Sequence, residues 1–418
     1  MRPYQLTRSQ LYADLVAAYK DARRHKRNKP YQRQFERNME TKLAALTDEL
    51  WTRTYKPGPS TCFIITDPKQ REVFAAQFRD RIVHHLYYNY VHTMLERTFI
   101  HDSYSCIRGR GTHYGIDRLE RHIRQESQNY REPCYVLKMD VRGYFMHIDR
   151  QRLLAIVEKS LWRMASHRIS RHAAETWQER VDMDFVCWLT RIIVMTNPVE
   201  DCRRRGDLSK WRGLPASKSL FHSPPGCGLP IGNLTSQLFS NVYLNELDQF
   251  VKRTLRCRHY GRYVDDFFVV SADRDWLVSL QSPIADFLSD KLGLTVSAGK
   301  SVVCDVRQGI DFLGAFLKPH RRYVNNATLK RMKPKIQALN VSDDALYIHN
   351  ALNSFLGLLC HYRSYAIRRR LFRQMPHFCK YGFFQADMEK YVLYRQRNHK
   401  KTKSFGNLKA FDYFCSSN

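Results

Sequence analysis

The chain has 418 residues, of which 43% are hydrophobic and 13% aromatic. So much apolar sequence can fill the cores of about two to four domains, which excludes a disordered chain and a small disulfide-held scaffold. Lys and Arg (69) outnumber Asp and Glu (40), and the formal net charge is +29. A charge this large indicates a polyanionic partner, with nucleic acid first, rather than a small neutral substrate.

No run of the sequence predicts export or a membrane span. The N-terminal segment lacks the apolar core of a signal peptide, and the longest stretch without a charged residue, Ser219 to Asn245, is interrupted by three prolines. We therefore expect a cytoplasmic protein without membrane contact. The 11 cysteines include no C-x-x-C pair and no Cys/His cluster at zinc-finger spacing, so we expect reduced thiols and no structural zinc.

The N-terminal segment predicts an amphipathic helix. Thr7 and Gln10 stand three residues apart before an apolar run, which is the pattern of a capping box. Five apolar residues follow at helical spacing. The helix runs into a basic cluster, which is either a solvated face or a contact to phosphate. The apolar residues are Leu11, Leu15, Ala18, Tyr19 and Ala22, and the basic ones are Arg23, Arg24, Lys26, Arg27 and Lys29.

From residue 60 on, strand and helix patterns alternate, which predicts the α+β class. A long basic connection separates the two halves of this pattern, after Leu161 and before Leu234. In chain order we expect a hairpin over Ser60–Ala76 with its turn at Asp67-Pro68, a helix over Gln77–Arg97, a Gly/Arg loop over Ser103–Thr112, a strand over Cys134–Met139, helices over Gln151–Leu161 and Leu234–Leu255, a hairpin over Arg258–Ser271, a helix over Asp275–Lys291, a strand over Thr295–Val303, the segment FLGAFL, and basic helices from Leu329 on.

Three aspartates stand where apolar strands turn or end. Asp265 and Asp266 lie at the turn of the predicted hairpin, and Asp140 ends the strand that precedes it. Adjacent like charges in such surroundings persist only if they face solvent or hold a cation. Carboxylates from two strand ends match what Mg²⁺ requires, and two such ions about 3.5–4 Å apart support in-line phosphoryl transfer. Taken alone, Y-x-D-D also fits ordinary turn aspartates.

The order of the elements resembles the palm of reverse transcriptases. A strand ends in Asp140, Tyr144 and Phe145 follow four and five residues later, and a Gly-x-x-x-Ser turn with its helix, YVDD on a hairpin, a lysine after a helix, and FLG come next. The resemblance implies a right-hand polymerase with fingers, a palm built on an antiparallel sheet flanked by helices, and a helical thumb. It also implies an RNA-directed DNA polymerase that uses two Mg²⁺ ions, with Mn²⁺ as an alternative, and binds template RNA, a DNA or RNA primer and dNTPs.

The resemblance assigns catalytic roles to matching residues. Asp140 and Asp265 are the expected principal metal ligands, Asp266 is a weaker one, and the backbone carbonyl of Val141 completes the shell. Lys300 matches the lysine proposed to protonate the pyrophosphate leaving group, and a solvated lysine is the alternative.

Further roles concern the nucleotide and the nucleic acid. Phe145 matches the steric gate that leaves no room for a 2′-hydroxyl, and simple core packing is the alternative. Arg71, and less surely Lys69, match residues that hold the incoming triphosphate, whose charge must be neutralised. The expected template contacts are Arg108 and Arg110, which could equally form a solvated loop, and the expected primer grip is Phe312, Leu313 and Gly314.

The stretch LPIGNLTSQ, Leu229 to Gln237, narrows the resemblance. Most reverse transcriptases have Gln-Gly-x-x-x-Ser-Pro here, whereas this chain has Ile231 before Gly232 and Gln237 in place of the proline. This variant resembles the reverse transcriptases of diversity-generating retroelements of bacteria and their phages. The resemblance implies error-prone copying of a template-repeat RNA at adenines for mutagenic retrohoming, with a small basic accessory variability protein as partner. It places Ile231, Gly232 and Gln237 in the nucleotide site.

Ile231 offers a physical reason for low fidelity. A glutamine at this position would contact the nucleotide through hydrogen bonds, and a site built on hydrogen bonds penalises a misplaced partner by leaving buried groups unpaired. An isoleucine makes no hydrogen bond and discriminates weakly among shapes. Tolerance of mismatches follows, whereas specificity for adenine does not.

The resemblance covers residues 60 to 330 well and the two ends loosely. Other bacterial reverse transcriptases, of the group II intron, retron or defence type, remain alternatives, as does a non-catalytic RNA-binding protein on the polymerase fold. The expected domains are an N-terminal basic helical extension (1–55), fingers (56–133), the first part of the palm (134–155), a fingers insertion (156–225), the second part of the palm (226–322), and a helical basic thumb with a C-terminal tail (323–418). In the thumb, we expect Arg368, Arg369 and Arg370 to contact phosphates.

Overall fold

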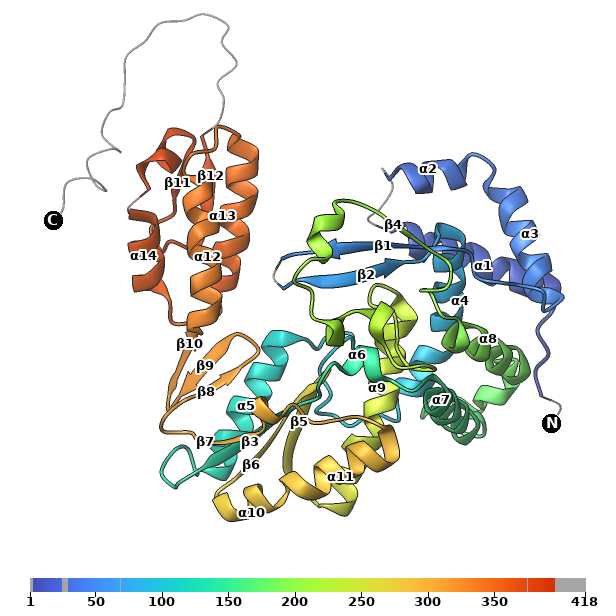
Figure 1. Cartoon of the computed structure of the whole chain (residues 1–418), viewed down its shortest axis with the longest axis horizontal. Coiled ribbons are helices and arrows are strands. Elements are labelled where there is room, and N and C mark those ends of the chain that lie inside the picture. Colours follow the sequence, from blue (N-terminus) through green and yellow to red (C-terminus); the bar gives the residue numbers. More distant parts are fainter. Residues whose placement is uncertain (1–2, 25–28, 68, 374, 395–418) are drawn as a thin grey trace, which may run out of the picture. The chain divides into compact units, whose positions relative to one another are not determined.

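A computed structural model describes residues 3–24, 29–67, 69–373 and 375–394 of the chain (Figure 1). The chain divides into two compact units, Met1–Arg322 and Tyr323–Asn418, which we describe separately. Lys26, Arg27 and Pro68 lie outside the described residues, as does the end of the expected tail. Within the described residues, no helix combines the length and the apolarity needed to cross a membrane.

Three helices open the first unit: α1 (Arg8–Arg23), α2 (Pro30–Glu36) and α3 (Met39–Trp51). All five apolar residues expected on α1 are buried. Only half of the expected capping box forms, because Thr7 accepts from the Gln10 backbone while the Gln10 side chain donates to Asp14. In the basic cluster, Arg23 pairs with Glu36 at 3.1 Å and Arg24 with Asp21 at 3.1 Å, so these two charges are engaged within the fold.

A three-stranded sheet follows, in the order β2-β1-β4. Strands β1 (Ser60–Ile65) and β2 (Arg71–Ala75) form the expected antiparallel hairpin. The third strand, β4 (Cys202–Arg204), pairs in parallel with β1 and comes from the segment that the sequence indicated to be a connection. Its three residues include two arginines, so it carries no local strand pattern.

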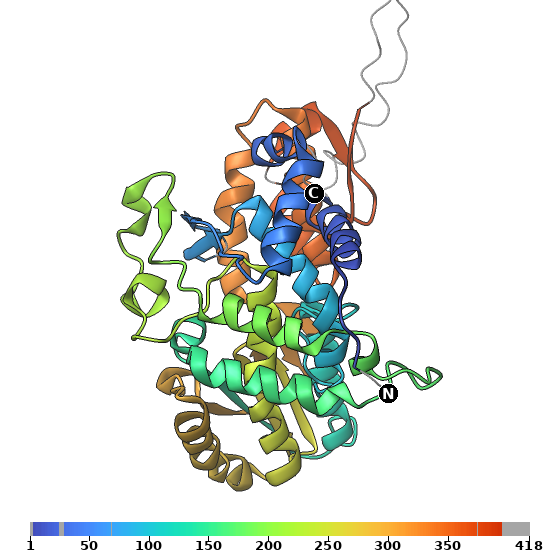
Figure 2. The same cartoon turned by 90° about the vertical axis from the view of Figure 1, so that its right-hand side faces the viewer.

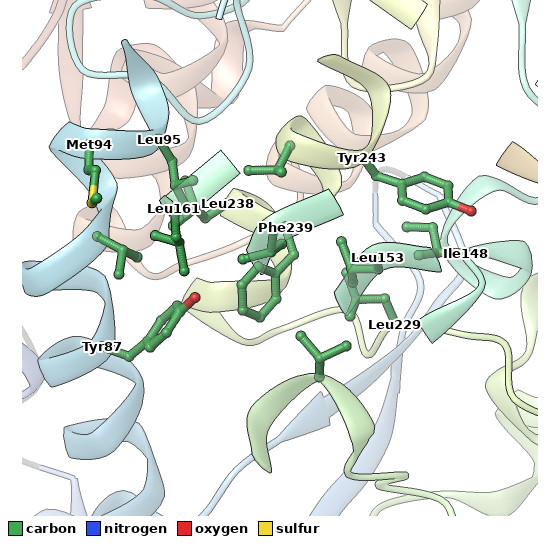
Figure 3. Packing of buried hydrophobic residues seen from close by; sticks show 14 of the residues in the cluster. Tyr87, Met94, Leu95, Ile148, Leu153, Leu161, Leu229, Leu238, Phe239 and Tyr243 are labelled. Atoms are coloured by element: carbon green, nitrogen blue, oxygen red, sulfur yellow. The ribbon is translucent and has the colours of Figure 1, made fainter. Parts of the chain in front are cut away.

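The main core of the first unit lies among helices α4 (Phe78–Glu96), α7 (Arg150–Ala165), α8 (Met183–Met195) and α9 (Leu234–Gln249). Figure 3 shows Tyr87 of α4, Leu161 of α7 and Phe239 of α9 among its side chains. Helix α9 is buried on almost every side, as expected for a central helix, and a π-helical turn, Phe250–Thr254, extends it. Helix α8 was not predicted, because its segment was interpreted as part of the basic connection.

A four-stranded antiparallel sheet has the order β5-β6-β3-β7. Its strands are β3 (Tyr135–Asp140), β5 (His259–Tyr263), β6 (Asp266–Ser271) and β7 (Val302–Asp305). Alternate residues of β6 face opposite sides: Phe267 belongs to the main core, whereas Phe268 contacts Tyr104 and His122, the latter on α5 (Thr112–Glu126). Both faces of this sheet are therefore covered. Figure 2 gives the same chain from the side.

Two expected elements of this region differ in the structure. The helix expected over residues 275–291 is two helices, α10 (Arg274–Ser279) and α11 (Gln281–Leu292). The strand expected over residues 295–303 forms only from Val302, since Ala298–Lys300 is a 3-10 turn. Ser-Ala-Gly at this point has no β-branched side chain to favour a strand.

A small sheet follows, made of β8 (Ile310–Phe312), β9 (Ala315–Lys318) and β10 (Arg321–Val324), and the boundary of the first unit, after Arg322, falls within β10. The turn between β8 and β9 consists of Leu313 (φ 49°) and Gly314 (φ 87°). Two successive residues with positive φ match the twist of a two-residue hairpin, and the glycine adopts its value without strain.

The second unit is a helical body with a short hairpin. Its helices are α12 (Asn326–Leu339), α13 (Ala345–Cys360) and α14 (Tyr365–Arg373), and its hairpin is β11 (Gly382–Phe384) with β12 (Tyr391–Leu393). In the basic segment of α14, Arg369 and Arg370 are exposed, whereas Arg368 is buried and donates to the backbone oxygen of Met388 at 2.9 Å. The expectation that all three arginines face phosphates is therefore wrong for Arg368.

Candidate active site

Three carboxylates gather at one end of the four-stranded sheet. Asp140 ends β3 and lies directly across the ladder from Asp266, the first residue of β6. Tyr263 pairs with Asp266 in the β5–β6 hairpin, so Val264 and Asp265 form its two-residue turn. The register alone thus places Asp265 beside the pair Asp140 and Asp266. This juxtaposition agrees with the grouping expected from the sequence.

These carboxylates repel one another. Burial, followed by the charge of Asp140, raises the pKa of Asp265. Burial and the charge of Asp265 raise the pKa of Asp266 to about 7, and a hydrogen bond with the Asp140 side chain adds to this rise. Two carboxyl groups can form a hydrogen bond only if one of them carries a proton. Three ionised carboxylates at this site would therefore repel one another, and either a proton or a cation is needed to offset their charge.

Lys300 supplies a positive charge to this cluster. Its Nζ lies 2.7 Å from Oδ2 of Asp140, and its side chain is 59% exposed. Burial opposes the charge of Lys300, but the hydrogen bond to Asp140 and the other carboxylates outweigh it and raise the pKa of the ammonium group. The backbone fixes this approach, because the amide of Lys300 donates to Ser297 and the amide of Ser297 donates to the carbonyl of Asp140.

The donor set of this cluster fits a hard divalent cation. Carboxylate oxygens gathered at the end of a sheet suit Mg²⁺ or Mn²⁺, which take several further ligands from substrate phosphates and water. Within the described part of the chain, no group of three or more His, Cys, Asp or Glu side chains is already arranged to hold a metal ion. Asp140, Asp265 and Asp266 would hold the ion together with the carbonyl of Val141, whose residue forms an isolated bridge with Val296.

An apolar surface lies beside the carboxylates. Phe145 belongs to the short helix α6 (Tyr144–His147), and its ring is half-buried, 5.3 Å from the ring of Tyr144. Phe145 and Ile231 both pack against a small cluster that contains Phe74 and Met146. The backbone ties them in place, since the carbonyl of Phe145 accepts from the amide of Leu229 at 2.8 Å and that of Ile231 from the amide of Phe74 at 2.8 Å. Phe145 and Ile231, which are both expected to contact the nucleotide, thus pack against the same apolar cluster.

Gly232 permits this contact between the LPIG segment and β2. Its φ is 125°, and a Cβ atom there would lie 2.8 Å from the carbonyl oxygen of Phe74 and 2.8 Å from Cγ1 of Val73. A larger residue would both strain the backbone and push β2 away. Gln237 is exposed in the first turns of α9.

The expected triphosphate ligands lie on the β1–β2 hairpin. Arg71 and Lys69 are exposed, and the charge of Arg71 acts on Asp265. The next residue, Glu72, is 1% exposed and accepts from the Trp211 indole at 3.0 Å and the Leu220 amide at 2.7 Å. Glu72 therefore fixes the segment before LPIG onto the strand that carries Arg71. The sequence analysis did not identify Glu72, although a carboxylate alternating with apolar residues on a strand was a usable signal.

Residues 66–317, more than half of the chain, match the profile of the family described as "Reverse transcriptase (RNA-dependent DNA polymerase)". The chain belongs to the reverse transcriptase family. The expected α+β class of a right-hand polymerase is thereby confirmed. No curated protein matches the sequence.

Among solved structures, this reverse transcriptase chain is similar to telomerases of two yeasts. One is the telomerase of Candida albicans in complex with the TWJ fragment of telomeric RNA, with a TM-score of 0.45 and 12% identity over 79% of this chain and 57% of that one. A second is the apo telomerase of Candida tropicalis truncated from its C-terminal domain, with a TM-score of 0.45 and 11% identity over 68% of this chain and 60% of that one. A third is described as the apo telomerase of Candida tropicalis, with a TM-score of 0.45 and 12% identity over 77% of this chain and 62% of that one. The chain thus spans roughly 57–62% of the length of these relatives.

The two arginines of the expected template loop differ in the structure. Arg108 is exposed. Arg110 instead directs Nη1 toward the backbone oxygens of His101 and Ser103, at 2.8 and 2.9 Å, and so shapes the loop itself. Arg110 therefore stabilises the conformation of this loop, which the sequence did not reveal.

The residues of the expected primer grip lie at the end of β8 and in the turn of the β8–β9 hairpin. Phe312 is buried, and its ring meets that of Phe268 edge-on at 5.2 Å. Leu313 and Gly314 form the tight turn described above. Their role toward a primer stays a prediction.

The sequence analysis also missed a buried ion pair next to the carboxylates. Arg262 and Asp248 are both fully buried, and two hydrogen bonds of 2.8 and 2.6 Å join them. The signal was present, because Arg262 is a charged residue in an apolar strand two positions before the turn and Asp248 ends the pattern LNELD.

Proposed function

We propose that this protein is an RNA-directed DNA polymerase. The observation that supports the proposal most is the gathering of Asp140, Asp265 and Asp266 at the end of β3 and the turn of β5–β6, inside the region that matches the reverse transcriptase family. The substrates would be dNTPs, with an RNA template and a DNA or RNA primer. The net charge of +29 supports a polyanionic partner of this kind.

In this proposal each residue near the carboxylates has a separate task. Divalent cations, when bound, would activate the primer hydroxyl and stabilise charge on the phosphates. Asp140, Asp265 and Asp266 would orient them. Lys300 holds a proton beside Asp140 and can deliver it to a departing phosphate oxygen. Arg71 and Lys69 would neutralise the triphosphate from the β1–β2 hairpin.

The decisive test replaces one turn carboxylate. Asp265→Asn should abolish primer extension on an RNA template with Mg²⁺, because a neutral amide oxygen does not neutralise the cations and binds them more weakly than a carboxylate, while RNA affinity stays within about twofold. Asp275→Asn is the matched control, since the Asp275 side chain is 97% exposed on α10. If Asp265→Asn extended primers as fast as the control, the polymerase assignment would be wrong, and RNA binding without synthesis in the wild type would favour the non-catalytic alternative.

We further propose that the polymerase makes adenine-mutagenic cDNA from a template-repeat RNA for diversity-generating retrohoming. The motif Ile231-Gly232 with Gln237 supports this lineage, and so does the apolar setting of Ile231 against the cluster that also supports Phe145. The partner would be a small basic accessory variability protein. Other bacterial reverse transcriptases remain the second candidate, and a near-identical repeat pair in the flanking DNA, differing at adenines, would distinguish the two.

Fidelity provides the biochemical test of this lineage. Ile231→Gln should reduce misincorporation opposite template adenines while overall extension stays within about tenfold, or roughly 1.4 kcal/mol in barrier. The readout is sequencing of cDNA made by both proteins from one template rich in all four bases. Ile231→Val is the control, because it keeps the apolar surface and should leave the error spectrum unchanged. An identical adenine spectrum for the Gln variant would contradict a role of Ile231 in infidelity.

A further inference from the structure

The turn that carries Asp265 has a strained backbone. Val264, the residue before Asp265, has φ 56°. This left-handed conformation is unfavourable for a β-branched side chain. Such a conformation persists only where its surroundings determine it, so the contacts of Val264 decide where Asp265 lies.

Two hydrogen bonds hold Val264 from different parts of the chain. Its amide donates to Oγ of Ser105 at 3.2 Å. Its carbonyl oxygen accepts from Nη1 of Arg262 at 3.0 Å. The backbone amide and the backbone carbonyl of Val264 are thus both hydrogen-bonded to side chains of the protein.

The arginine that holds Val264 is itself fixed. Asp248 of α9 binds its Nε and Nη2 at 2.8 and 2.6 Å, with both side chains fully buried. The Tyr260 hydroxyl donates to the same carboxylate at 2.7 Å. A planar guanidinium with two such bonds has one orientation, and its remaining nitrogen, Nη1, then lies at the turn.

The serine on the other side is also fixed. Ser105 Oγ donates to Oδ1 of Asn241 at 3.1 Å, and Nδ2 of Asn241 donates to the carbonyl of Ser105 at 2.8 Å. The loop of Ser105 runs along β5, because the amide of Arg262 donates to the Asp102 carbonyl and the amide of Tyr104 to the Arg262 carbonyl. Helix α9 fixes both Ser105 and Arg262, and these two residues hold the backbone of Val264 in the turn.

We propose that Arg262, Asp248 and Ser105 are positioning residues that fix the Val264 peptide and thereby the place of the Asp265 carboxylate. The proposal rests on the proposed function for its effect on catalysis. It also connects the loop that carries Arg108 to the catalytic turn, since Ser105 belongs to that loop. A carboxylate displaced by about 1 Å can reduce a rate about a hundredfold, so this support affects the rate directly.

Ser105→Ala tests the proposal with little disturbance. It removes one oxygen and leaves the Val264 amide without its acceptor. Thr190→Val is the matched control, because Thr190 is also buried in the first unit and its hydroxyl bonds Tyr87 Oη at 2.8 Å, in the helical core. Ser105→Thr keeps a hydroxyl at the same place and should restore the wild-type behaviour.

Two measurements on the full chain separate positioning from general stability. Hydrogen exchange of the peptide that contains Val264 should become at least about tenfold faster in Ser105→Ala than in wild type or Thr190→Val. Single-turnover primer extension should fall at least about tenfold at saturating dNTP, and more Mg²⁺ should be required, while RNA affinity and the thermal midpoint match those of Thr190→Val.

Each outcome decides the matter. Unchanged exchange at the turn, or faster exchange with a wild-type extension rate, would overturn the positioning role. A loss of rate in proportion to a loss of folded protein, seen equally in Thr190→Val, would also overturn it. If the wild type extends no primer, the proposed function fails, while the exchange measurement and Mn²⁺ affinity still show whether Ser105 fixes the turn. Arg262→Lys provides a second variant, since it keeps the charge but loses the paired bonds to Asp248.

Discussion

The Phe145 ring is half-buried between Tyr144 and the cluster of Phe74 and Met146. One part of this ring therefore packs on protein, and another part is exposed. The amide of Leu229 holds the carbonyl of Phe145, so the backbone of Phe145 cannot shift without moving the LPIG segment. A rigid ring at this place would exclude a 2′-hydroxyl by its volume.

Phe145→Ala should accordingly raise the ratio of ribonucleotide to deoxyribonucleotide incorporation by at least about tenfold. The check is primer extension with each triphosphate in turn. Phe221→Ala is the control, because Phe221 is another partly buried ring on the same cluster, 5.7 Å from Phe74. If both variants lost stability alike and neither changed the ratio, Phe145 would be a packing residue only.

For single residues, the sequence predicted that Asp140, Asp265 and Asp266 lie together, but it did not predict what they contact and it missed Glu72, Arg262 and Asp248. Asp140, Asp265 and Asp266 could be identified because carboxylates inside apolar strands need a reason. The ion pair of Lys300 with Asp140 spans 160 residues and depends on the 3-10 turn at Lys300, which no local pattern indicated. The template contact of Arg110 stays a prediction, and its bonds to the backbone oxygens of His101 and Ser103 could not be read from the sequence.

Helices and strands with regularly spaced apolar residues could be predicted from the sequence. Strands that form only by pairing with a distant part of the chain could not. The stripe of α1 and the β5–β6 hairpin follow from local spacing. Strand β4 exists only because β1 lies beside it. Helix α8 was within reach, since Phe185, Val186 and Leu189 have helical spacing, but the arginines around it hid the pattern.

One contact between elements has a consequence for pH. His84 of α4 shares a hydrogen bond of 2.8 Å with Thr235 of α9, and burial, with the charges of His85 and Arg81, lowers the pKa of His84 to about 4. The folded protein thus holds His84 neutral, whereas an unfolded histidine titrates near 6.5. The stabilisation is fully present above pH 6.5 and is lost as the pH falls toward 4.

His84→Gln should therefore flatten the fall in stability between pH 6.5 and 4. Because one pKa unit corresponds to about 1.4 kcal/mol, the effect is on the order of 1 to 3 kcal/mol. Thermal midpoints measured at several pH values give the slope. His92→Gln serves as the control, because His92 lies two turns later on the same helix and bonds the carbonyl of Tyr88 in its own helix. Equal slopes for the wild type and His84→Gln would contradict the assignment.

The molecule as a whole carries its charge unevenly between surface and interior. Among the described residues, most arginines and lysines are at least partly exposed, but Arg150 and Arg262 of the first unit and Arg368 of the second are buried. A count of basic residues therefore overstates the surface available to phosphates. Exposed arginines should affect the salt dependence of RNA binding, and buried ones should affect folding.

The two kinds of arginine can be compared on α14. Reversing the charges of Arg369 and Arg370 should weaken binding to unrelated RNA sequences and reduce the slope of log affinity against log salt by about 0.7 for each phosphate that the variant no longer binds. Arg368→Met should leave that slope unchanged and lower the thermal midpoint, because it removes the bond to Met388. Titrations at several salt concentrations measure the slope. A slope unaffected by Arg369 and Arg370 would remove α14 from the RNA-binding surface.

The parallel pairing of β4 with β1 also bears on how the chain folds. It joins Ser60 to Cys202 and so closes a loop of about 140 residues, whereas β1 and β2 meet across a short turn. Local pairs form quickly and distant ones wait until the intervening chain is compact. The β1–β2 hairpin should thus form early, and β4 should cover the outer edge of β1 only after α4, α7 and α8 have packed. Until then the unpaired backbone groups along that edge of β1 are open to pairing with a neighbouring chain.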